Sequence, residues 1–193
     1  SNAPLSGIAT GFMLTRSVRD CAALLDMMAG PFAGDFYEIP GPARAFANEV
    51  VYPEQPLDIA LVVDAWSGLP VDPQILQATQ NAASFLQTQG HRIHTASPDF
   101  DYAQYLDAQK AIWCAHLYHS INNMAEYLQR TPGPDNLQTT TLATYERGRT
   151  VSADEFLRAR DVYEGITRRV GEFLSRYDAM IAPTACIQPE VLG

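Results

Sequence analysis

Two histidines and a neighbouring cysteine are the first candidates for a metal site or a nucleophile in this sequence. His116 and His119 are three positions apart in a segment with helical periodicity, so both imidazoles could reach one metal ion. A third ligand of suitable spacing is missing nearby, so we expect no metal site. Cys114 and His116 are two positions apart, which places them on different sides of a helix. A cysteine–histidine nucleophile is therefore not expected either.

Aromatic and sulfur-bearing residues offer a different role, as the wall of a binding pocket. Trp113, His116 and Tyr118 lie in the same helical segment and would form either part of a pocket wall or part of the core. Cys186 follows the last predicted strand, and residues 64–67, which include an aspartate, a tryptophan and a serine, follow the first. Open α/β sheets bind ligands beyond the carboxyl ends of their strands. These residues could line such a site, and ordinary loop residues are the alternative.

The elements that must position these residues alternate between strands and helices. Short apolar runs predict strands over residues 57–63, 91–95 and 179–182. Helical spacing of apolar residues predicts helices over residues 75–86, 101–129, 140–147 and 152–177. A strand, a helix and a strand at this spacing favour parallel pairing. The sequence therefore predicts an α/β fold, with a small, mostly parallel sheet flanked by several long helices.

A further helix is predicted near the start of the chain, over residues 17–29. Ser17 is placed to cap its first turn, with Asp20 three residues later, and Gly30 ends it. Arg16 and Asp20 are four residues apart, a spacing at which an ion pair can form on one helical face. We expect this motif to support the fold, with Ser17 acting as a cap. The proline-rich residues 31–57 are predicted to be an irregular connector.

Length and composition narrow the class of protein. Residues 1–3 look like the remnant of an expression tag, and residues 4–193 are long enough for one domain. The formal net charge is −9 and no long basic run occurs, so we expect no nucleic-acid partner. Neither a membrane span nor a signal peptide is recognisable. Three widely spaced cysteines suggest free thiols in a reducing compartment, and we expect a cytoplasmic protein.

Two segments resemble the amidase signature hydrolases. Residues 11–37 read GFMLTRSVRDCAALLDMMAGPFAGDFY, and their Gly-x-Met-x-x-Arg-Ser-Val-x-Asp pattern resembles the segment just downstream of that family's catalytic core. Residues 177–193, with Tyr-Asp-x-x-Ile-Ala-Pro-Thr, are similar to its late strand and loop. Residues 34–46 and 57–73 are most like the subgroup that contains 6-aminohexanoate-cyclic-dimer hydrolase, which opens a cyclic amide.

The resemblance implies a C-terminal region of an enzyme that hydrolyses linear or cyclic carboxamides without a cofactor. Members of the family transfer an acyl group with a nucleophilic serine, a second serine in a cis peptide and a neutral lysine. Lys110 is the only lysine of this chain and lies inside a predicted helix, and no Gly/Ser-rich stretch is present. None of the triad can therefore be assigned here. We expect a chain that is inactive alone and that supports the fold and the substrate pocket.

The resemblance also implies partners. The first is the upstream catalytic core of the same polypeptide, which the apolar face with Val18, Leu25 and Met28 would contact, and the second is a small amide substrate. Association into a homodimer is a further expectation. Two other functions stay open at this point. One is a subunit similar to the A subunit of the glutaminyl-tRNA-forming amidotransferase, and the other is a stand-alone, non-catalytic binding module derived from an amidase.

Overall fold

The computed structural model describes residues 4–35, 37, 39–51 and 55–190. These residues form two compact units, with the division between Gln55 and Pro56. The expected tag remnant at residues 1–3, Pro53 of the connector and the last residues of the second family-like segment, 191–193, lie outside the described residues. Folding of residues 4–193 as one domain stays a prediction. None of the helices among the described residues combines the length and the apolar character that a bilayer span requires.

The first unit contains the predicted N-terminal helix. It has a short 3-10 turn, η1 (Pro4–Gly7), and two helices, α1 (Val18–Met28) and α2 (Phe46–Glu49). The Ser17 hydroxyl oxygen accepts a hydrogen bond from the Asp20 N–H at 3.1 Å, which confirms the predicted cap. Arg16 precedes this cap and is outside the helix, so it shares no helical face with Asp20. Within the described residues no ion pair joins the two, and the expectation of such a pair is corrected.

The connector was predicted to be irregular, and it holds the short helix α2. The Asp26 carboxylate on α1 accepts hydrogen bonds from the N–H groups of Phe46 at 2.6 Å and Ala47 at 2.9 Å. These are N–H groups of the first turn of α2, which have no partner within the helix. The capping contact comes from α1, which is why the local sequence did not reveal α2. On α1 itself, Val18 is 73% exposed and Met28 is 49% exposed.

The second unit is built on a parallel sheet, as predicted. Its strands are β1 (Asp58–Leu61), β2 (Arg92–Thr95) and β3 (Ala179–Ile181), in the order β2-β1-β3. β1 pairs in parallel with both neighbours, and Ile59 lies opposite Ile93 and Ala179. The residues from Ile59 to Val62 are buried because β1 is the central strand. The α/β fold class is therefore confirmed.

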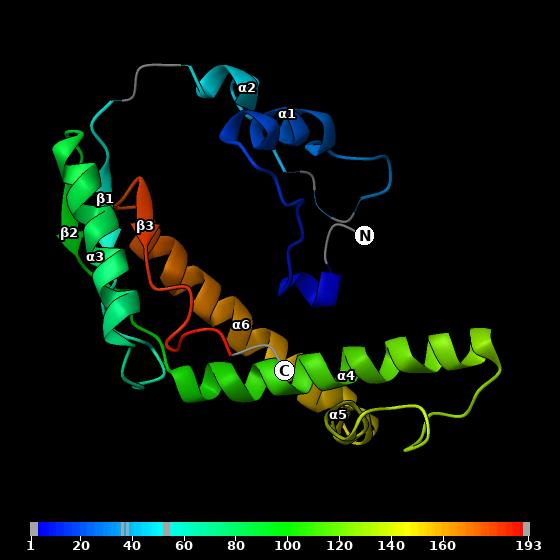
Figure 1. The fold of residues 1–193 in the computed structure, drawn as a ribbon. Helices are drawn as coiled ribbons and strands as arrows, with labels where there is room; N and C mark the ends of the chain where they lie inside the picture. Colours follow the sequence, from blue (N-terminus) through cyan, green and yellow to red (C-terminus); the bar gives the residue numbers. More distant parts are fainter. Residues whose placement is uncertain (1–3, 36, 38, 52–54, 191–193) are drawn as a thin grey trace. The chain divides into compact units, whose positions relative to one another are not determined.

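The second unit also contains four helices, and not all of them lie against the sheet (Figure 1). They are α3 (Pro73–Thr88), α4 (Tyr102–Leu128), α5 (Thr139–Arg149) and α6 (Ala153–Leu174). Ser152 caps α6, since its hydroxyl oxygen accepts a hydrogen bond from the Glu155 N–H at 3.0 Å. α6 ends at Leu174, three residues before the predicted end. The chain then enters β3, where the Asp178 N–H donates to the Asp58 carbonyl at 2.8 Å.

The long helix α4 packs against α5 and α6 through a buried face of mainly small side chains together with Ile112. Its buried residues are Ala108, Ala111, Ile112 and Cys114. The larger apolar residues of α4 form a second stripe at helical spacing, which is half-buried at Leu106, Leu117 and Ile121 and exposed at Trp113 (48%), Met124 (57%) and Leu128 (52%). Small residues allow two helix backbones to approach closely. The face of α4 that packs closely against α5 is therefore not the face that carries its largest apolar residues.

A charged cluster joins β1 to β2 at the start of both strands. The Asp58 carboxylate accepts hydrogen bonds from the Arg92 guanidinium, with Nε at 2.8 Å, and lies 2.8 Å from His94 Nε2. The Asp58 N–H donates to the Asp178 carboxylate at 2.8 Å. Hydrogen bonds from Arg92 first, and then from His94, hold the pKa of Asp58 well below its ordinary value. The cluster therefore links all three strands at this edge.

Replacing Asp58 with asparagine is expected to lower the thermal midpoint at neutral pH. Because the pKa of Asp58 is lowered in the folded state, its charge stabilises the fold above the ordinary aspartate pKa, and this contribution is lost as the pH falls through the lowered value. The difference between the wild type and Asp58→Asn should therefore shrink on acidification below about pH 4. Thermal unfolding, followed by circular dichroism at a series of pH values from neutral to acid, measures this difference in thermal midpoint. Asp99→Asn, at an exposed position, is the matched control, and equal midpoints for all three proteins at neutral pH would contradict the prediction.

Candidate functional site

The carboxyl edge of the sheet brings together two loops that are far apart in the sequence. β1 and β3 run in parallel, so residues 62–72 and residues 182–190 leave the sheet at the same edge. The Val62 N–H donates to the Ile181 carbonyl at 2.9 Å, and the Asp72 N–H donates to the Cys186 carbonyl at 2.8 Å. The two loops are therefore tied together at both ends.

A cavity of about 150 Å³ lies between these loops. Its wall includes residues that were singled out because they follow strands, namely Asp64, Trp66, Ser67 and Cys186. The other lining residues come from the same two loops and from the first turn of α4, and they are Val62, Ala65, Val71, Tyr102, Ala182, Pro183, Thr184 and Ala185. The lining is mostly apolar, with Asp64 as its one formally charged residue, which is typical of a small-molecule site.

Trp66 forms the aromatic side of the cavity and is held in place from two directions. Its indole N–H donates to the Ser97 hydroxyl at 2.9 Å, and Ser97 follows β2. The Trp66 ring lies 5.7 Å from the Phe100 ring, with 40° between the planes. Sequence reasoning did not identify Ser97 or Phe100, because each acts only through its contact with Trp66. The indole is therefore a preorganised surface for an apolar ligand.

A row of aromatic rings continues behind Trp66 to α6. Phe100 lies 6.0 Å from Tyr105, which lies 5.5 Å from Tyr163, between ring centres. Burial is the main cause that raises the pKa of Tyr163 above its ordinary value, and a hydrogen bond with Tyr105 adds to it. The Tyr163 hydroxyl therefore stays protonated at neutral pH. This row supports the cavity wall and offers no acid or base to it.

Asp72 anchors the segment that carries Cys186. Its carboxylate accepts a hydrogen bond from the Gln74 N–H at 2.8 Å, which caps α3, and lies 3.3 Å from the Gln188 side-chain nitrogen. The backbone hydrogen bond from Gln74, and then the one from Gln188, lower the pKa of Asp72. The capping position of Asp72, just before Pro73, is visible in the sequence, whereas its second role depends on the fold.

The aromatic residues on α4 lie apart from this cavity. Trp113, His116 and Tyr118 are not among its lining residues, so the structure does not bring them together with Cys186. The His116 ring lies 6.0 Å from the Phe156 ring. Burial, and then repulsion by His119, lowers the pKa of His116, so its imidazole is mainly neutral at pH 7. The Tyr118 ring lies 5.1 Å from the Tyr145 ring on α5, with 37° between the planes.

The remaining reactive groups have no catalytic arrangement among the described residues. Lys110 Nζ lies 3.3 Å from an Asp107 carboxylate oxygen, and both side chains are exposed. The described part of the chain holds no group of three or more histidine, cysteine or acidic side chains that could bind a metal. His119 Nε2 lies 3.0 Å from the Asn123 side-chain nitrogen instead. The site at the sheet edge therefore provides a surface shaped to contact a ligand.

Comparison with known proteins identifies the amidase family over nearly the whole chain, in agreement with the resemblance seen in the sequence. The family model described as amidase matches residues 5–193. A 6-aminohexanoate-cyclic-dimer hydrolase from Paenarthrobacter ureafaciens is 26% identical over 194 residues, which cover 98% of this chain and 39% of that protein. The chain thus spans well under half the length of this curated relative, and the matched part is its C-terminal part.

Solved structures agree with the sequence match. The structure of 6-aminohexanoate cyclic dimer hydrolase complexed with substrate matches with a TM-score of 0.81 at 26% identity, over 90% of this chain and 36% of that one. A bacterial aryl acylamidase of the amidase signature family matches with a TM-score of 0.78 at 16% identity, over 91% of this chain and 36% of that one, and it shares the fold. The chain belongs to the amidase signature family and has the fold of the C-terminal part of these relatives.

Proposed function

We propose that this chain is the C-terminal part of a hydrolase that cleaves linear or cyclic carboxamides, and that it forms one wall of the substrate pocket. The nucleophilic serine, the cis-serine and the lysine belong to a preceding part of the same polypeptide, and this chain alone is inactive. Family membership supports the reaction class, and Lys110, paired with Asp107 on an exposed face, supports a catalytic lysine elsewhere.

The cavity between the two loops is the observation that carries the proposal. It lies beyond the carboxyl ends of parallel strands, where α/β sheets bind ligands. The Trp66 indole and the backbone around Cys186 present apolar and polar surface side by side, which suits an amide with hydrocarbon on either side. The cavity is small, so it accommodates one side of a substrate, and the preceding part of the polypeptide supplies the reacting groups.

The residues on α4 form a second, separate part of the proposed wall. Trp113 is 48% exposed and offers an apolar surface, and the Tyr118 ring lies 5.1 Å from the Tyr145 ring of α5. The His116 imidazole, mainly neutral at pH 7, can take part in hydrogen bonds without adding charge to a neutral amide site. A substrate longer than the cavity would reach these residues only in the complete polypeptide.

Filling the cavity is the experiment that tests the proposal. In the longer polypeptide, Cys186→Trp is expected to raise KM for amide hydrolysis at least about tenfold, a loss of about 1.4 kcal/mol of substrate binding, with a smaller change in kcat. An indole at position 186 would occupy most of a cavity of about 150 Å³. Initial rates over a range of substrate concentrations, with the cyclic dimer of 6-aminohexanoate and an aryl amide, provide both constants.

Two control variants show whether a change in KM comes from the filled cavity, from loss of the thiol or from misfolding. Cys186→Ser keeps the size of the side chain and is expected to leave KM unchanged, because the thiol has no role in the proposed reaction. Phe85→Trp places the larger ring on α3 at a residue that is 63% exposed and outside the cavity. A Cys186→Trp enzyme with normal thermal stability and wild-type KM for both amides would overturn the proposed pocket wall.

A further inference from the structure

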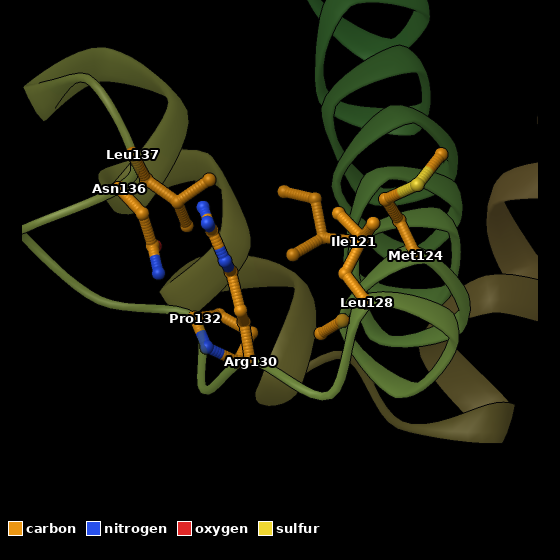
Figure 2. Close-up of a pocket in the computed structure, with 8 residues that line it drawn as sticks. Ile121, Met124, Leu128, Arg130, Pro132, Asn136 and Leu137 are labelled. Carbon is orange, nitrogen blue, oxygen red and sulfur yellow. The ribbon is translucent and has the colours of Figure 1, made fainter.

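A second hollow lies in another part of the same unit, where α4 ends. Its volume is about 180 Å³. Figure 2 shows the side chains that line it. One wall is the last two turns of α4, and the other is the loop that leads to α5. The lining residues are Ile121, Met124, Ala125, Leu128, Arg130, Pro132, Asn136 and Leu137. None of them lines the cavity at the sheet edge, so this end-of-helix pocket is a separate feature.

The end-of-helix pocket is apolar apart from Arg130 and Asn136. Figure 2 shows the Arg130 side chain standing between the apolar side chains of α4 and those of Asn136 and Leu137. Within residues 55–190 and the other described ranges, the Arg130 guanidinium has no ion pair and no hydrogen bond, and only its backbone N–H is engaged, with the Ala125 carbonyl at 2.9 Å. Its five N–H donors are therefore available to a ligand.

The loop wall of the pocket is fixed by its own hydrogen bonds. The Asn136 side-chain oxygen accepts the Gly133 N–H at 3.0 Å, and its nitrogen donates to the Thr131 carbonyl at 2.9 Å. Gln129, with φ 51° and ψ 45°, ends α4 in the left-handed conformation and turns the chain into this loop. Asn136 is thus occupied in holding the loop, which leaves Arg130 as the group that can recognise a polar ligand.

We propose that this pocket binds a short aliphatic monocarboxylate. The guanidinium recognises a carboxylate through two parallel hydrogen bonds, and the apolar walls contact the hydrocarbon chain. A cavity of about 150 Å³ holds one benzene molecule, so the pocket accommodates a ligand of about six to eight non-hydrogen atoms, such as pentanoate. The proposal concerns a binding site that is independent of amide hydrolysis.

Charge and shape together favour this class of ligand over others. The carbonyl groups at the C-terminal end of α4 carry about half a negative charge, which disfavours an anion, but the full positive charge of Arg130 more than offsets it. An aliphatic ammonium would be repelled by Arg130. An uncharged alcohol would gain the apolar contacts, but its hydroxyl would replace the two charge-assisted hydrogen bonds of a carboxylate with a single weaker one.

Methyl NMR of the 193-residue chain tests the site directly. Labelled isoleucine and methionine methyl groups report on Ile121 and Met124, and Met124→Leu assigns the second signal. Sodium pentanoate at constant ionic strength is expected to shift both signals with a low-millimolar dissociation constant. Pentan-1-ol, which lacks the charge, and acetate, which lacks the chain, are each expected to bind at least about tenfold more weakly.

Two variants test whether the charge of Arg130 is needed for binding. Arg130→Gln is expected to weaken pentanoate binding at least about tenfold, because the charge-assisted hydrogen bonds are lost. Arg160→Gln removes the same charge from an exposed position on α6 and should leave the affinity unchanged. Equal affinities for pentanoate and pentan-1-ol, equal affinities for the wild type and Arg130→Gln, or the absence of shifts at Ile121 and Met124 would each overturn the proposal.

Discussion

Replacing Gly148 with alanine is expected to destabilise the chain by about 3 kcal/mol, the upper part of the range for overpacking a close contact. A Cβ atom at this position would lie 2.1 Å from the Cys114 carbonyl oxygen and 2.6 Å from the Tyr118 Cβ. Because the closer of these atoms belongs to the backbone of α4, a change of rotamer cannot relieve the overlap. α4 and α5 would have to separate, and this would expose Cys114 and Tyr145. Chemical denaturation followed by circular dichroism gives the free energy of unfolding.

Gly165 provides the matched control within a neighbouring helix. It lies inside α6, and a Cβ there would meet nothing within 4 Å. Gly165→Ala is therefore expected to stabilise the chain by about 0.5–1 kcal/mol, because alanine favours the helix over glycine. A Gly148→Ala variant with the same free energy of unfolding as the wild type would contradict the close approach of α4 and α5.

Much of the secondary structure could be predicted because its signals are local. Ser17 and Ser152 cap the helices that follow them, whereas the helix predicted from residue 75 begins at Pro73, two residues earlier. The run from residue 57 to 63 is apolar except for Asp58, which is typical of a strand buried on both faces. The parallel order followed from a helix placed between two strands, and the structure confirms it.

Contacts between distant residues could not be predicted in the same way. Asp58 meets Arg92 and His94 only through the register of β1 and β2, which no local pattern specifies. Trp113 was placed on the apolar stripe of α4, yet it is exposed because α4 packs through its small residues. Gly148 showed no signal of its own, since its importance comes from α4 passing beside it.

The position of the candidate site could be predicted from the sequence, but only some of its residues could be. Parallel strands end at one edge of a sheet, so residues that follow β1 and β3 were bound to meet, and Trp66 and Cys186 do line one cavity. Ser97 and Tyr102 join the site through tertiary contacts, which the sequence does not show. Trp113 and His116 stay a proposal for a separate part of the wall.

The largest expected effect concerns catalysis itself. The longer polypeptide is expected to hydrolyse amides at least about 10⁶-fold faster than the uncatalysed reaction, whereas the 193-residue chain should give no acceleration. The physical reason is that acyl transfer needs an activated nucleophile, and the described residues pair Lys110 with Asp107 and place it on an exposed helix face. A folded chain with an intact cavity can bind part of a substrate without cleaving it.

The most direct test of this account is one rate comparison. Initial rates of amide hydrolysis would be measured for the purified 193-residue chain and for the longer polypeptide at equal concentration, with circular dichroism to show that both are folded. The account predicts enzymatic turnover by the longer polypeptide and only the uncatalysed rate for the 193-residue chain. Turnover by the 193-residue chain that is lost on mutating a residue within it would contradict the account, because the chain would then hold its own catalytic groups.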